Sequence, residues 1–209
     1  MENPTPMSES QSQRRSVPRT VTPLSVPAID SAGALRFPLK QQALDALDTL
    51  AAAYERQGAA AALCPTSNLF LGSGLFDFAA ADAVRMPLSL ATDVGGGTSF
   101  SMLRTMNEIY KVARMGGTYL PALRMFYLAT LGGARSMGLE GTIGNFMPGN
   151  EADFVVLDPQ CTPLLARRTG HFEALEELLF ALALLGDDRT VFATYSAGKL
   201  LHSRSGSRA

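Results

Sequence analysis

Two short apolar runs, each ending in polar or glycine residues, constrain the fold of this sequence more than any other feature. The first covers residues 59–64 and is closed by Pro65. The second covers residues 88–92, follows Pro87 and ends at Asp93 and three glycines. Apolar runs of this length, bounded by proline and glycine, are typical of buried strands. Helical patterns flank both runs, so the sequence predicts a parallel α/β arrangement in the middle of the chain.

Apolar residues at helical spacing predict the helices. They are expected at about residues 44–54, at 101–115, from Pro121 onward with an interruption at Gly132 and Gly133, and at 173–185. Further strands are expected at residues 154–157, 191–195 and 199–202, the last two joined by a turn at Ala197 and Gly198. We therefore expect the final part of the chain to form strands and one helix, with the strands belonging to a separate small sheet.

The two ends of the chain have a different composition. Residues 1–40 begin with alternating prolines and serines that show no apolar period, and we expect this segment to be disordered. Residues 203–209 are expected to form a disordered tail. Neither end contains the continuous apolar stretch of a signal peptide.

Charge and cysteine content exclude several classes of function. The net charge is −1 and the isoelectric point is about 6.1, so no nucleic-acid partner is expected. No apolar run approaches the roughly 20 residues of a membrane span, so no membrane partner is expected. Cys64 and Cys161 are isolated and form no metal-binding pair, which favours a reduced, cytoplasmic setting.

Asp93 is the strongest candidate for a functional residue. It directly follows a predicted strand and precedes Gly95, Gly96 and Gly97. Functional side chains of parallel barrels lie at the carboxyl ends of strands, where glycines let the backbone approach a ligand closely. A carboxylate there could bind a metal or act as a general base. The plainer interpretation is that Asp93 caps the next helix or orders the glycine turn.

Cys64 begins a second polar group at a strand end, which continues through Asn68. A nucleophilic cysteine needs a nearby base, and the only histidines are His171 and His202, both late in the chain. A buried structural cysteine is therefore favoured. The two glycine clusters, at residues 72–74 and 95–97, match neither a P-loop nor a dinucleotide-binding fingerprint.

Four longer motifs carry a resemblance to a known family. They read CPTSNLFLGSGLF from Cys64, TDVGGGTSFSML from Thr92, FYLATLGGARSMGL from Phe126 and IGNFMPGNEADFVVLD from Ile143. In this order they resemble the guanine deaminases of the amidohydrolase superfamily. The resemblance implies an α/β fold, namely the C-terminal part of a metal-dependent (β/α)8 barrel of the TIM type, with part of a small β-sandwich.

The resemblance also divides the chain. Residues 41–142 would form the end of the barrel, with its seventh strand at 60–66 and its eighth at 88–93. Residues 143–202 would add to the β-sandwich and supply a terminal helix.

The same resemblance implies a reaction. A zinc-activated water would convert guanine to xanthine and ammonia, a step of purine catabolism. Asp93 would be both a catalytic residue and a metal ligand, and the family suggests a homodimer. The family's other zinc ligands are histidines on earlier strands, yet no histidine precedes His171. We therefore expect the chain to represent the C-terminal half of such an enzyme and to be inactive alone. The alternatives are another amidohydrolase, a deaminase or chlorohydrolase, or a non-catalytic fragment.

Overall fold

The computed structural model describes residues 28–29, 35–36 and 59–204. The predicted helix at residues 44–54 and most of the predicted disordered segment 1–40 lie outside the described residues. Within that segment, β1 (Ala28–Ile29) and β2 (Leu35–Arg36) pair antiparallel. No helix among the described residues is long and apolar enough to cross a membrane.

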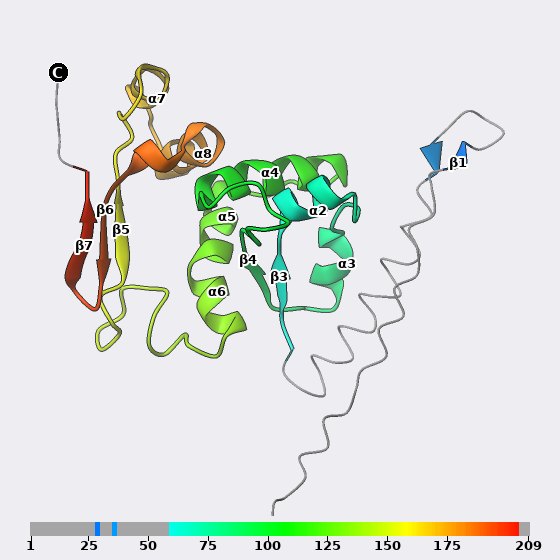
Figure 1. Ribbon diagram of the computed structural model, residues 1–209, viewed down its shortest axis with the longest axis horizontal. Helices are drawn as coiled ribbons and strands as arrows, with labels where there is room; N and C mark the ends of the chain where they lie inside the picture. The colour runs from blue at the N-terminus through cyan, green and yellow to red at the C-terminus, as the bar shows by residue number, and fades with distance from the viewer. Residues whose placement is uncertain (1–27, 30–34, 37–58, 205–209) are drawn as a thin grey trace, which may run out of the picture.

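The centre of the fold is a parallel pair of strands, as the sequence predicts. β3 (Ala61–Leu63) and β4 (Leu88–Leu90) pair so that Ala62 lies opposite Ser89. The connection between them contains two short helices, α2 (Pro65–Leu71) and α3 (Phe78–Ala83). The leucines of the two strands are buried in the main core, which the adjoining helices cover. Both strands therefore present their carboxyl ends at the same edge (Figure 1).

Three helices follow β4. They are α4 (Met102–Met115), α5 (Ala122–Ala129) and α6 (Leu131–Ser136). Helix α4 buries Met106 and Ile109 almost completely, because residues three and four apart share one face of a helix. The predicted helix at residues 101–115 is thus confirmed, with Ser101 at its N-cap.

The predicted interruption at Gly132 and Gly133 is wrong in its position. The helix breaks at Thr130, whose φ and ψ are −126° and −98°, and both glycines lie inside α6. A Cβ on Gly132 would come within 2.9 Å of the carbonyl oxygens of Leu88 and Tyr127. Glycine is therefore present because α6 approaches β4 closely, and not because the helix ends there.

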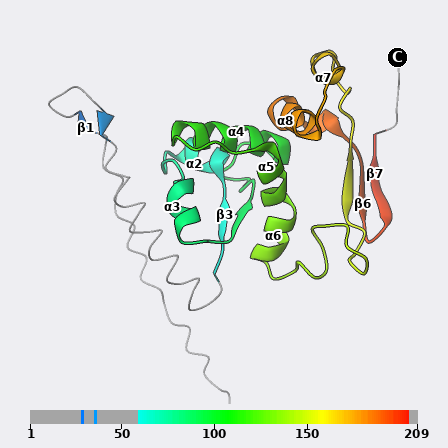
Figure 2. The same ribbon diagram turned by 180° about the vertical axis from the view of Figure 1, so that it is seen from behind.

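The last part of the chain forms a three-stranded antiparallel sheet in the order β5 (Phe154–Leu157), β6 (Val191–Ser196), β7 (Lys199–Ser203). Two helices, α7 (Pro163–Thr169) and α8 (Leu175–Leu185), lie between β5 and β6 in the sequence. Helix α8 packs on α4 and α5, and the sheet stands on the far side of α5 and α6 from the parallel pair (Figures 1 and 2). The predicted strands and terminal hairpin are confirmed, and α7 is an additional helix that the pattern did not predict.

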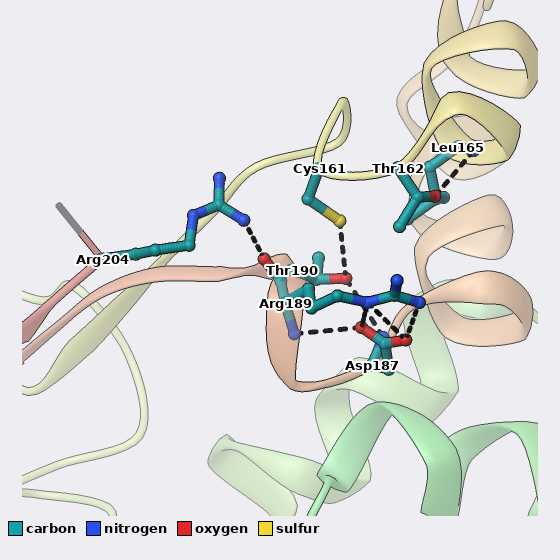
Figure 3. A network of polar contacts seen from close by, with 7 residues as sticks. All are labelled: Cys161, Thr162, Leu165, Asp187, Arg189, Thr190 and Arg204. Carbon is teal, nitrogen blue, oxygen red and sulfur yellow. Dashed lines mark hydrogen bonds and ion pairs between the residues drawn. The ribbon is translucent and has the colours of Figure 1, made fainter. Parts of the chain in front are cut away.

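A polar network ties the end of α8 to the loop after β5 (Figure 3). Asp187 accepts hydrogen bonds from the Arg189 guanidinium, with Nη2 at 2.6 Å from Oδ2, and the pKa of Asp187 is lowered chiefly by these bonds. The Thr190 hydroxyl lies 3.4 Å from the thiol of Cys161. Asp187 also caps a short 3₁₀ helix, Asp188–Thr190.

The disordered tail predicted at residues 203–209 is wrong for its first two residues. Ser203 is the last residue of β7. Arg204 forms an ion pair with Asp158, donates to the carbonyl of Arg189 and lies over the ring of Phe192. These contacts fix residues 203 and 204 to the sheet.

Candidate functional site

Asp93 lies where the sequence predicts, just beyond the carboxyl end of β4. Its φ is +47°, in the left-handed region that aspartate enters more readily than most residues. Its side chain is exposed, and its carboxylate has no hydrogen-bond or ion-pair partner among the described residues. A carboxylate held on a strained backbone without a structural partner is free to act on a ligand.

The structure separates the two plainer interpretations of Asp93. Its main-chain carbonyl accepts hydrogen bonds from the amides of Gly96 at 3.1 Å and Gly97 at 2.5 Å, so it does order the glycine turn. It does not cap the next helix, because the hydroxyl of Ser101 accepts from the amide of Arg104 at 3.4 Å. The turn therefore uses the backbone of Asp93 and leaves its side chain unused.

The start of α2 supports this turn from the neighbouring strand end. The Thr66 hydroxyl donates to the carbonyl of Thr92 at 3.4 Å, and Thr66 and Ser67 are both buried. A Cβ on Gly96 would lie 2.5 Å from Ser67 Oγ and 3.3 Å from Asp93 Oδ2. The carboxylate of Asp93 therefore lies over Gly96, with α2 packed directly behind the loop.

Cys64 lies beside Asp93 but is not an activated nucleophile. Burial raises the pKa of its thiol, and the negative charge of Asp93 raises it further. The thiol donates to the carbonyl of Ala62 at 3.6 Å. A reactive cysteine needs the opposite, a lowered pKa, so these contacts support a structural role, but Cys64 is half-buried and not buried as the sequence predicts.

The metal-binding groups of the described residues do not make a complete metal site. A hydrolytic zinc site takes three protein ligands, and no three His, Cys, Asp or Glu side chains come together in residues 59–204 or the short strands before them. His171 and His202 are both exposed, in the α7–α8 loop and in β7. Asp93 therefore offers one metal ligand, and the described residues by themselves do not form a zinc site.

A cavity of about 520 Å³ opens beside the Asp93 loop. Its walls include Thr66, Ser99, Arg104 and Asn107, while Asp93 itself does not line it. Asn107 Nδ2 donates to the carbonyl of Leu184 at 2.5 Å, and its Oδ1 is a buried oxygen with no partner in the described part of the chain. The cavity is large enough for a small ligand but adjoins the candidate carboxylate without enclosing it.

Sequence reasoning missed how the loop is supported. The sequence predicts only a polar group at a strand end, whereas Thr66 and Ser67 lie in α2. The available signal was Cys64-Pro65, because proline is favoured at the first position of a helix.

A carboxylate at the carboxyl end of a parallel strand, in front of a glycine-rich loop, defines one edge of an α/β barrel-type site. Residues 32–201 match the model of the amidohydrolase family, and the chain belongs to that family. The described residues accordingly form a partial TIM-barrel-like fold.

Several relatives that match this chain are guanine deaminases. The guanine deaminase of Escherichia coli K12 is 51% identical over 144 residues, which cover 69% of this chain and 33% of that protein. The probable guanine deaminase of Deinococcus radiodurans is 38% identical over 151 residues, covering 71% of this chain and 34% of that protein. A solved structure of the E. coli enzyme matches with a TM-score of 0.71 at 47% identity, over 76% of this chain and 36% of that one. The chain thus spans about a third of the length of these curated relatives.

Proposed function

We propose that this chain supplies the Asp93 edge of a guanine deaminase, which hydrolyses guanine to xanthine and ammonia in purine catabolism. The observation that carries the proposal is Asp93 itself, a carboxylate with no partner among the described residues, on a left-handed backbone at the end of β4. The 51% identity to the E. coli enzyme supports guanine as the substrate.

Asp93 has two roles in this proposal. It would be one ligand of a zinc ion whose remaining ligands the described residues do not supply, and its carboxylate would accept and return a proton. Thr66 and the glycine turn hold the backbone on either side of this carboxylate, through the carbonyls of Thr92 and Asp93. The three-stranded sheet would be part of a β-sandwich, and the complete enzyme would be a cytoplasmic homodimer.

The test uses a chimera, because the chain covers only part of its relatives. The segment of the E. coli enzyme that matches residues 59–204 is replaced by these residues, and xanthine release from guanine is measured with added zinc. We expect turnover by the chimera, none by its Asp93→Ala variant, and retained turnover in Cys64→Ser. Glu140→Ala, which removes an exposed carboxylate from a turn, is the matched control and should also stay active.

Three outcomes would count against the proposal. Activity that survives Asp93→Ala would remove the proposed role of the carboxylate. Preference for another purine, a pyrimidine or a chlorotriazine would favour a different amidohydrolase. A folded but inactive chimera would favour a non-catalytic chain. The 209-residue chain alone should show negligible turnover, because one carboxylate binds zinc weakly.

A further inference from the structure

A second cavity lies at the opposite end of β4 from Asp93. It has a volume of about 580 Å³ and contains three arginines, Arg85, Arg124 and Arg135, together with Tyr127. Arg85 comes from the connection between α3 and β4, Arg124 and Tyr127 from α5, and Arg135 from α6. Apolar side chains, including Met86 and Leu88, complete the wall.

Only one of the three guanidinium groups is neutralised. Arg124 forms a two-pronged ion pair with Asp82, with Nη1 at 3.0 Å from Oδ2. Arg135 Nη1 donates to the hydroxyl of Tyr127 at 3.0 Å, and its Cζ lies 5.7 Å from the centre of that ring. Tyrosine carries no compensating charge, and Arg85 has no acidic partner among the described residues. The cavity therefore holds two positive charges without counter-ions from this part of the chain.

Two backbone features shape this cavity, whose Arg85 and Arg135 side chains are exposed. Gly132 allows α6 to approach β4, since a Cβ there would lie 3.1 Å from the ring of Tyr127 as well as against two carbonyl oxygens. This close approach sets the Tyr127 ring, and with it the guanidinium of Arg135. Arg85 has a φ of +51°, a left-handed conformation that is costly for arginine. An arginine thus stands where glycine or asparagine would fit the backbone better.

We propose that this cavity binds a small organic anion. Arg85 and Arg135 hold its oxyanion, because the guanidinium fork matches the geometry of phosphate and carboxylate groups. The apolar wall takes the rest of the molecule, as in most small-ligand sites of this size. The cavity is at the amino-terminal end of β4, so this site is separate from the Asp93 edge and does not rest on the proposed function.

The test measures binding of phenyl phosphate to the full 209-residue chain by isothermal titration calorimetry. Benzoate and inorganic phosphate are titrated in parallel, so that a carboxylate is compared with a phosphate and an organic anion with a bare one. Phenyl phosphate should bind, and Arg85→Asn should weaken it roughly tenfold, the usual effect of losing a charged hydrogen bond. Asparagine tolerates the left-handed backbone, so this variant should fold at least as well as the parent.

The control is Arg114→Asn. Arg114 is an exposed arginine of α4 whose Cζ lies 6.0 Å from the centre of the Tyr119 ring. This variant should leave the affinity unchanged, and Arg135→Gln should repeat the loss seen with Arg85→Asn. Failure of both organic anions to bind, or an equal loss of affinity in Arg114→Asn, would overturn the proposal. Inorganic phosphate binding as tightly as phenyl phosphate would also overturn it, because the apolar wall would then contribute nothing.

Discussion

Gly97→Ala is the substitution that most directly tests the geometry of the Asp93 loop. A Cβ on Gly97 would lie 1.8 Å from the carbonyl oxygen of Thr92, 2.9 Å from that of Asp93 and 3.0 Å from Thr66 Oγ1. Two of these atoms belong to the main chain and cannot rotate away as a flexible side chain would. The loop itself must therefore move, and it carries the hydrogen bond from the Gly97 amide to the Asp93 carbonyl.

The expected cost follows from the size of the overlap. Relieving it means widening the contact with Thr92 from 1.8 Å to the 3.0 Å at which real contacts begin. Overpacking of this kind typically costs about 1–3 kcal/mol, and a domain of this size loses about 2–4 °C in Tm for each kcal/mol. We therefore expect Gly97→Ala to lower the Tm by about 2–12 °C.

The assay is thermal unfolding followed by circular dichroism, with all proteins at the same concentration. Gly141→Ala is the matched control, because a Cβ there has no neighbour within 4 Å and the backbone is not left-handed. It should leave the Tm unchanged or raise it slightly, as restricting the unfolded chain predicts. If Gly97→Ala melts within a degree of Gly141→Ala, the packing of the loop described above is incorrect.

Three further predictions concern charge and association. Because hydrogen bonds from Arg189 lower the pKa of Asp187, their stabilisation is present at neutral pH and is lost as the pH falls below about 4 and through that lowered pKa. Asp187→Asn should therefore lower the urea midpoint more at pH 7 than at pH 3, and equal losses would contradict this. Burial is the main cause of the raised pKa of Cys64 and the charge of Asp93 is the second, so Asp93→Asn should make alkylation of Cys64 by iodoacetamide faster near neutral pH. An unchanged rate would show that the two groups do not interact. The purified chain should self-associate when it is followed by light scattering. Among the described residues β3 and β4 pair only with each other, and the ring of Phe100 is 86% exposed. A monodisperse monomer would contradict this prediction.

Much of the fold could be predicted because its elements carry local signals. β3 and β4 are apolar runs next to proline, and α4 repeats its apolar side chains every three or four residues. Helix α2 escaped prediction because Thr66, Ser67 and Asn68 are weak helix formers that favour turns. In the structure their helix is stabilised by tertiary contacts, with Thr66 and Ser67 buried behind the glycine turn.

The candidate site was predictable only in part, for a related reason. The location of Asp93 at a strand end could be predicted because it directly follows the apolar run 88–92. Its left-handed backbone and the packing of α2 against Gly96 carry no local sequence signal. The arginine cavity had no signal, because Arg85 lies in the connection before β4 while Arg124 and Arg135 lie on two later helices, and only the fold brings them together.

The position of α7 and α8 between β5 and β6 has a consequence for the order of folding. β5 cannot pair until β6 has been reached along the chain, and in between α8 must dock on α4 and α5. Closing that long loop costs entropy before any ladder hydrogen bond is gained. Docking of α8 would bring β6 close to β5, so β5 should gain protection from hydrogen exchange later in refolding than the local β6–β7 hairpin.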